Sequence, residues 1–149
     1  MSEIRFTVHG EARPAGSKRA FVNPKTGKAI VTDTSGKAGK TWRSDVRDAA
    51  GLAYGGPLLD EPLRVTMTFY RQRPRSHYGT GRNADVLKLS APRYPAKRPD
   101  LLKLARAVED ALTGIIWRDD SLIVDELLHG RYADDDRARV EILVERLGE

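Results

Sequence analysis

The chain has 149 residues, of which 40% are hydrophobic and 32% charged, and its formal net charge is +5. It has no cysteine, which excludes disulfides and cysteine-ligated zinc, and no apolar run long enough to cross a bilayer, so no membrane partner is expected. We expect one domain over residues 1–149 and a cytoplasmic location, because the N-terminus alternates like a strand and is not a signal peptide.

The N-terminal part of the chain predicts a strand followed by a hairpin. Apolar and polar residues alternate over residues 4–8, which is the period of a half-buried strand. Two short β-prone runs, 20–22 and 29–31, flank a turn at 23–27 that contains proline and closes with glycine. This arrangement predicts a β-hairpin.

A loop, a helix and a second strand are expected next. Residues 33–40 are polar and predict a loop. Apolar residues recur at three- and four-residue spacing over 41–54, which predicts a helix that ends before two glycines. The alternation over 63–70 predicts the clearest strand of the chain.

Residues 71–98 predict a long loop rich in cations. Its Lys and Arg residues are interleaved with His77, Tyr78 and Tyr94, a mixture that suits contact with a nucleic-acid backbone and unstacked bases. A loop of this length in a compact domain is usually functional or disordered.

The C-terminal part predicts a helix and two strands. An apolar stripe runs from Leu101 to Leu112, with Asp100 at the N-cap position and Gly114 where the helix would stop. Two further strands are expected within 122–128 and 138–147. The whole order predicts an α/β (α+β) fold, in which a small mixed β-sheet packs against two main helices.

Positive charge gathers in two segments. Residues 13–47 hold nine Lys or Arg and two acids, and residues 71–98 hold eight Lys or Arg and one acid. Clustered cations with few acids are the footprint of a polyanion-binding surface. We expect basic loops at about 10–40 and 71–98 to bind DNA; a solvated basic surface is the alternative. The candidate DNA-binding residues are Lys18, Arg19, Arg73, Arg75, Arg82, Lys97 and Arg98.

Acidic residues stand at both ends of the second predicted helix, at Asp100 and at Asp119-Asp120. A helix of about 14 residues spans roughly 20 Å, so these acids can meet only if the next strand passes back along the helix. Mg²⁺ binds one or two carboxylates plus water and phosphate, and such a site suits phosphodiester hydrolysis. The alternative is that Asp100 only caps the helix and the acid pair only forms a turn.

The stretch from Arg98 to Asp120 resembles the RusA family of Holliday-junction resolvases. That family's pattern is a basic residue, Pro or Arg, Asp-x-Asp-Asn/Lys-Leu, a Lys, Asp-Ala-Leu, and an aromatic before x-Asp-Asp. The chain reads RPDLLKL from Arg98, then Arg106, DAL from Asp110, and WRDD from Trp117. The segments ARPAGSKRAF and SHYGTGRNADVLKLSAPRYP are similar to the phage-type branch of the family.

The resemblance implies a homodimeric endodeoxyribonuclease that depends on Mg²⁺, with Mn²⁺ as a substitute, and that cuts four-way junction DNA in recombination and repair. It also implies a phage or prophage gene in a bacterial host. By the same resemblance, Asp100 and Asp120 bind the metal, with Asp119 beside them. Lys103 or Arg106 would steady the scissile phosphate, which completes the expected catalytic set of Asp100, Asp120, Arg106 and Lys103.

The chain departs from the family pattern at the second acid of Asp-x-Asp, which is Leu102 here, and at the helix lysine, which is Arg106. Glu109 and Asp110 are the nearest spare carboxylates, although Glu109 lies about 10 Å from Leu102 along the helix. One hypothesis is that another acid completes the site. The alternatives are a junction-binding protein that cleaves weakly or not at all, and an RNA-binding or interaction protein.

Overall fold

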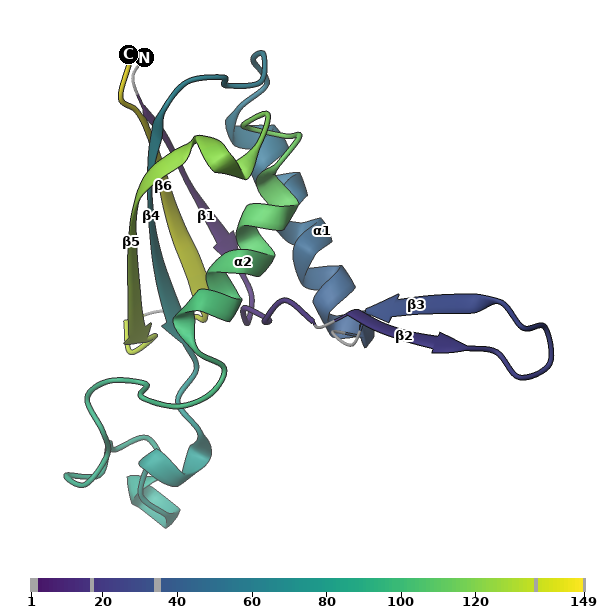
Figure 1. Ribbon diagram of the computed structural model, residues 1–149. Coiled ribbons are helices and arrows are strands. Elements are labelled where there is room, and N and C mark those ends of the chain that lie inside the picture. Colours follow the sequence, from purple (N-terminus) through teal and green to yellow (C-terminus); the bar gives the residue numbers. More distant parts are fainter. Residues whose placement is uncertain (1–2, 17, 34–35, 136, 149) are drawn as a thin grey trace.

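The structure is a computed structural model that describes residues 3–16, 18–33, 36–135 and 137–148 (Figure 1). Its strands are β1 (Glu3–His9), β2 (Lys18–Val22), β3 (Ala29–Asp33), β4 (Leu63–Arg71), β5 (Ile123–Tyr132) and β6 (Arg139–Arg146). Its helices are α1 (Gly36–Ala53) and α2 (Leu101–Leu112), with short 3₁₀ turns η1 (Arg75–His77), η2 (Gly81–Asn83) and η3 (Asp120–Leu122). Among the described residues, no helix is long and apolar enough to cross a membrane.

Four strands form one mixed sheet in the order β1-β6-β4-β5. β4 pairs in parallel with β5, whereas β6 pairs antiparallel with both β4 and β1. Two parallel neighbours need a crossover connection, and α2 lies within the segment that joins β4 to β5. The mixed sheet with two main helices confirms the fold class predicted from the sequence.

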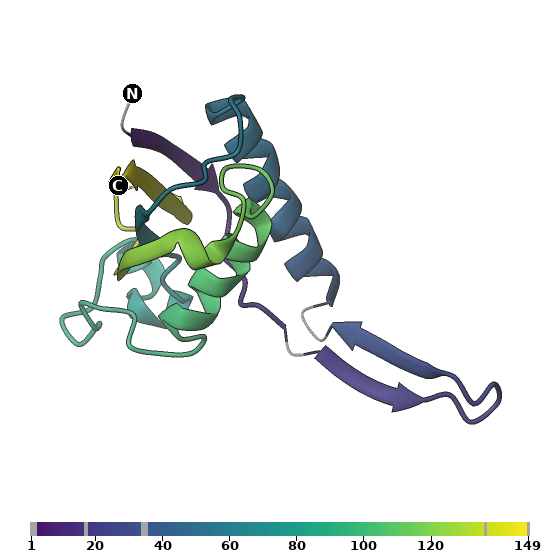
Figure 2. The same ribbon diagram turned by 45° about the horizontal axis from the view of Figure 1, so that its top comes forward.

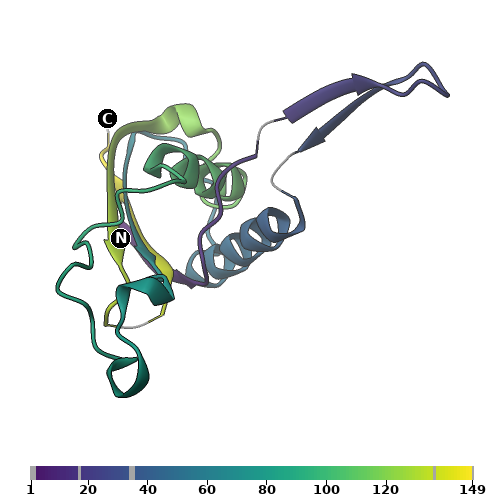
Figure 3. The ribbon, with the colours of Figure 1, turned by 90° about the horizontal axis from the view of Figure 1, so that it is seen from below.

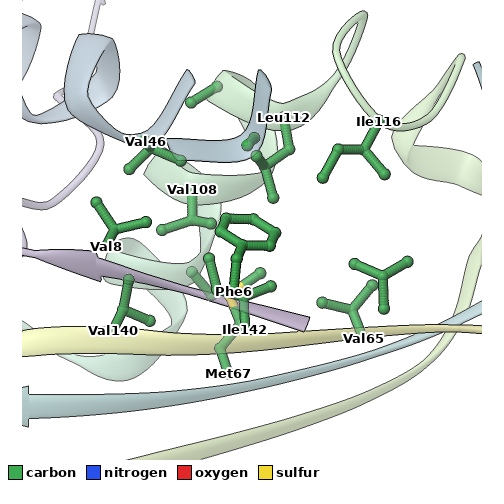
Figure 4. Close-up of a cluster of buried hydrophobic side chains, with 14 of the residues drawn as sticks. Phe6, Val8, Val46, Val65, Met67, Val108, Leu112, Ile116, Val140 and Ile142 are labelled. Carbon is green, nitrogen blue, oxygen red and sulfur yellow. The ribbon is translucent and has the colours of Figure 1, made fainter. Parts of the chain in front are cut away.

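Both helices cover the same face of the sheet (Figures 1 and 3). β4 contributes the centre of the core, since its alternate residues Leu63, Val65, Met67 and Phe69 are fully buried. α1 and α2 pack Val46, Val108 and Leu112 against this face (Figure 4). The alternation of the strand and the apolar stripe of each helix therefore meet in one core, as their periods predicted.

Helix α1 begins earlier than the sequence predicted. It spans Gly36–Ala53, so residues 36–40, expected to be part of a polar loop, form its first turn. Lys37, Ala38 and Lys40 are good helix formers, and Gly39 is buried. The apolar stripe of the helix starts only at Trp42, so the polar residues before it predict a loop.

The hairpin prediction is confirmed. β2 and β3 pair antiparallel, from Lys18 opposite Asp33 to Val22 opposite Ala29. The two strands form a separate sheet and project from the rest of the molecule as an arm (Figures 1 and 2). Between β1 and α1, the chain therefore carries a basic two-stranded ribbon that stands away from the core.

Arg73 anchors the segment between β4 and α2. The sequence placed Arg73 among the DNA-binding residues, but its guanidinium is buried. It donates to Asp134 Oδ1 at 2.7 Å and to the Pro92 carbonyl at 2.6 Å, and it lies 4.1 Å from the ring centre of Tyr132. These contacts engage the charge inside the protein, so we assign Arg73 to holding the segment against the end of the sheet.

Candidate functional site

Asp100 stands at the N-terminus of α2, as the sequence predicted. Its carbonyl accepts the first helical hydrogen bond, from the Leu104 amide at 3.2 Å, but its side chain makes no capping hydrogen bond. The carboxylate is exposed. The alternative that Asp100 serves only as a side-chain cap therefore has no support in this geometry.

Asp100 opens onto a groove of about 600 Å³. One wall is the segment from Tyr94 to Leu101, and the other is the end of β5 from Leu128 to Arg131, with Arg71 at the base. Cations dominate the charge of the groove. Among the described residues that line it, Asp100 is the only acid.

Helix α2 and strand β5 run in opposite directions side by side (Figure 1). At one end, Gly130 faces Leu101, because a Cβ built on Gly130 would lie 3.4 Å from Leu101 Cδ2. At the other end, Glu109 forms a side-chain hydrogen bond with Glu126. The strand does pass back along the helix, as a shared metal site would require. The residues it brings to Asp100 are Leu128 to Arg131, whereas Asp120 lies at the far end of α2.

At that far end, Glu109 interacts with Glu126 and also responds to the charge of Asp120. Burial, the charge of Glu126 and a hydrogen bond with Glu126 raise the pKa of Glu109 to about 7, and the charges of Asp120 and Asp110 add to the rise. Glu109 is half-buried on α2, Glu126 belongs to β5 and Asp120 to η3. The structure thus places the spare acid Glu109 beside Glu126 and close enough to Asp120 to respond to its charge, and away from the position of Leu102.

The turn that carries Asp119 and Asp120 is fixed by Trp117. Its indole is fully buried and its Nε1 donates to Thr113 Oγ1 at 3.0 Å. The following amide, of Arg118, donates to the Leu59 carbonyl at 3.0 Å. The aromatic residue of the family-like pattern therefore acts as an anchor that holds the acid pair at the start of β5.

The two acids of the pair do different work. Asp119 caps η3, since its carboxylate accepts a hydrogen bond from the Ser121 amide at 3.1 Å and another from the Ser121 hydroxyl. These hydrogen bonds lower the pKa of Asp119. Asp120 accepts no side-chain hydrogen bond from the described residues. Its carboxylate is exposed and free to bind a cation.

The acids near the C-terminal end of α2 suit a Mg²⁺ ion that is bound by only one or two protein carboxylates. Within the described ranges, no three His, Asp or Glu side chains are grouped closely enough to hold a metal on their own. Glu109, Asp120 and Glu126 take part in none of the ion pairs between described residues. Mg²⁺ commonly binds through one or two carboxylates, with waters and a substrate phosphate as its other ligands. Carboxylates without an ion pair to a described residue suit this way of binding Mg²⁺.

Lys103 and Arg106 lie on α2 between the two acidic positions, and both are exposed. Leu102 is 68% exposed. Because Leu102, Arg106 and Glu109 follow each other at four- and three-residue spacing, they share one face of the helix. Two exposed cations of α2, Lys103 and Arg106, therefore lie between the groove at Asp100 and the acids at the other end of the helix.

Four of the remaining predicted DNA-binding residues are on the surface. Arg75, Arg82, Lys97 and Arg98 are exposed on the segment between β4 and α2. The backbone of Lys18 and Arg19 forms the start of β2, but their side chains lie outside the described part of the structure. The DNA-binding role of these six residues remains a prediction.

Glu126 is the site residue that sequence reasoning missed. The alternation of β5 carries a signal for it, because Glu126, Leu128 and Gly130 point toward the same side of the strand. Glu126 is nevertheless exposed, and the sequence did not show that its neighbour on α2 is Glu109.

Comparison with known proteins gives two matches. The family model described as "Endodeoxyribonuclease RusA" matches residues 11–145. The chain is also similar to the uncharacterized protein YqaN of Bacillus subtilis (strain 168), with 27% identity over 142 residues that cover 95% of this chain and 96% of that protein. The family match includes the acids at both ends of α2 and both basic segments.

Proposed function

The chain belongs to the RusA endodeoxyribonuclease family, and from this premise we propose that it is a Mg²⁺-dependent endonuclease that resolves four-way DNA junctions as a homodimer. The observation that carries the proposal is the pair of carboxyls formed by Glu109 on α2 and Glu126 on β5. The charge of Asp120 on η3 adds to the raised pKa of Glu109, and α2 also carries exposed cations.

Asp120 and Glu109 are the proposed protein ligands, with Glu126 held beside them by its hydrogen bond with Glu109. Bound Mg²⁺ supplies an activated water and stabilises the leaving oxygen in phosphodiester hydrolysis. Burial makes the largest contribution to the raised pKa of Glu109, and repulsion from Glu126, Asp120 and Asp110 adds to it. A cation at this position would relieve that repulsion and let Glu109 lose its proton.

In the proposal, Asp100 is an acid near the DNA phosphates that bind along α2. Asp119 shapes the turn that carries Asp120. Lys103 and Arg106 would hold the scissile phosphate from the exposed face of α2. Arg106 keeps the charge of the family's lysine and offers a planar set of donors, but it exchanges protons less readily. Its proposed role is therefore positioning and charge stabilisation.

A labelled four-way junction tests the proposal, with products read on a denaturing gel with and without Mg²⁺ or Mn²⁺. Wild type should give paired nicks that need the metal, and Asp120→Asn should abolish cleavage while junction binding stays within about twofold. The matched control is Asp125→Asn, because Asp125 lies on β5 but pairs with Arg64 at 3.2 Å. Equal cleavage by wild type and Asp120→Asn would remove the assignment.

Leu102 favours a second candidate function, a junction-binding protein that is catalytically weakened. The exposed leucine stands where the family pattern has a carboxylate. This candidate predicts salt-sensitive binding to four-way junctions and no nicked product at any Mg²⁺ or Mn²⁺ concentration. The same gel separates the two candidates.

A further inference from the structure

Tyr94 is the exposed aromatic residue of the segment between β4 and α2. The sequence offered three rings for contact with bases, at His77, Tyr78 and Tyr94. His77 packs edge-on against Tyr132 at a centroid distance of 5.4 Å and contacts Arg73, and Tyr78 is half-buried. Tyr94, in contrast, is 49% exposed at the groove beside Asp100.

Two guanidiniums lie close to the Tyr94 ring. The Cζ atom of Arg131 lies 5.3 Å from the ring centre and that of Arg93 lies 5.4 Å from it. Both distances are within the range of cation–π attraction. Half of the side chain still faces solvent, so the guanidiniums steady the ring and leave part of it open.

The wall that carries Tyr94 is held in place by Arg71. Its guanidinium donates to the carbonyl oxygens of Lys97 at 3.2 Å and of Arg98 at 3.0 Å. Within the segment, the amides of Ala96 and Lys97 donate to the carbonyls of Tyr94 and Pro95, both at 2.9 Å. The ring therefore sits on an ordered support, which lowers the entropy cost of binding a ligand on it.

The groove combines the features that a nucleotide needs. Its volume of about 600 Å³ lies in the range of pockets that hold small ligands. Pro95, Leu101 and Leu128 give it an apolar lining, and Lys97, Arg98 and Arg131 give it positive charge at the rim. Apolar surface and an open ring suit a base, whereas the cations suit the phosphate attached to it.

We propose that this groove holds one unstacked nucleotide of the DNA substrate, with its base stacked on Tyr94 and its phosphate bound by Lys97, Arg98 and Arg131. The inference rests on the proposed function and deepens it, because strands that exchange at a junction offer nucleotides at the branch point. It assigns Tyr94 a role in substrate positioning, separate from metal binding.

The test is a binding competition between a short single-stranded thymidine oligomer and an oligomer of equal length in which every base is missing. The two probes carry the same phosphates. Wild type should bind the thymidine oligomer roughly 5- to 150-fold more tightly, as one stacked base predicts. Tyr94→Ala should lose that preference, and Tyr94→Phe, which keeps the ring, should retain it.

The salt dependence of oligomer binding gives a second readout. Tyr94→Ala should leave its slope unchanged, because no phosphate contact is lost, whereas Lys97→Ala should reduce the slope by about one. Equal binding of the two probes by wild type, no binding of either, or a preference that survives in Tyr94→Ala would each overturn the proposal. Metal-dependent junction cleavage that requires Asp120 would still stand in that case, so the two failures are distinguishable.

Discussion

At the residue scale, the chemistry of the site depends on Glu109. The family-like pattern loses an acid at Leu102, and residue spacing alone makes Glu109 a poor substitute because it lies two helical turns away. The tertiary structure changes the relevant neighbour, since Glu109 interacts with Asp120 and Glu126. The missing carboxylate is therefore compensated, in our proposal, at the other end of the exposed face of α2.

Glu109→Gln should lower the rate of junction cleavage by about 10- to 100-fold, since it removes a charged oxygen from the proposed ligand set. Adding Leu102→Asp to Glu109→Gln should not restore the rate, because position 102 is about 10 Å away along the helix. Single-turnover cleavage of a labelled junction measures both effects. Full recovery in the double variant would show that the site is centred on position 102 instead.

Glu109 also predicts a pH dependence of stability in metal-free buffer. Its pKa is about 7 in the folded protein against an ordinary value of 4.5. The folded state thus keeps a proton that the unfolded state releases, and the contribution of Glu109 to stability falls as the pH rises through this window. The loss of melting temperature between about pH 5 and about pH 8 should be smaller in Glu109→Gln than in wild type. Identical losses in both proteins would contradict the shift; Asp125→Asn is the control.

At the element scale, the segment between β4 and α2 does two kinds of work. Arg73 is buried and Arg71 is half-buried, and the hydrogen bonds of both fasten the segment to the end of the sheet. Arg75 and Arg82, on η1 and η2, face solvent. Arg73 and Arg75 are only two residues apart, yet one is buried and the other is exposed. Composition alone could not distinguish their roles, because burial depends on the path of the chain.

Arg73→Ala and Arg75→Ala form a matched pair that tests this division. Arg73→Ala should lower the free energy of unfolding by about 2 kcal/mol, because charged hydrogen bonds to Asp134 and Pro92 are lost. Arg75→Ala should leave stability within about 0.5 kcal/mol and reduce the salt slope of junction binding by about one. Urea denaturation and binding titrations at several salt concentrations measure these effects. Equal stability losses in the two variants would refute the assignment.

At the scale of the whole molecule, our proposal places DNA binding and catalysis in different parts of the fold. The β2–β3 arm projects from one side, and the segment between β4 and α2 extends beyond the end of the sheet (Figure 1). A two-stranded ribbon has the dimensions to enter the major groove of DNA. In a two-fold symmetric dimer, which we propose, two such sets of surfaces would match the symmetry of a four-way junction.

Replacing residues 18–33 with a short Gly/Ser linker should separate binding from folding. The melting temperature should stay within about 4 °C of wild type, since the arm stands apart from the core. Junction affinity should fall and its salt slope should decrease by up to about four, because the segment carries Lys18, Arg19, Lys25 and Lys28. Unchanged affinity would show that the arm does not contact DNA.

The sequence by itself determined the elements and the family-like stretch. Alternation at 63–70, the apolar stripe of α2 and the hairpin turn are local patterns, and local backbone geometry imposes their periods. The first turn of α1 was missed, because its residues are polar and the apolar stripe begins after it. β5 also continues to Tyr132, four residues past the predicted end at 128.

Only the tertiary structure decided which charged residues meet. The antiparallel course of α2 and β5 separates Asp100 from Asp120 and brings Glu126 of β5 beside Glu109 of α2, whose pKa is also raised by the charge of Asp120. The same folding buries Arg73 and leaves Tyr94 open. Contacts between elements depend on how strands and helices pack across long stretches of chain, and neither the period of a segment nor its charge contains that information.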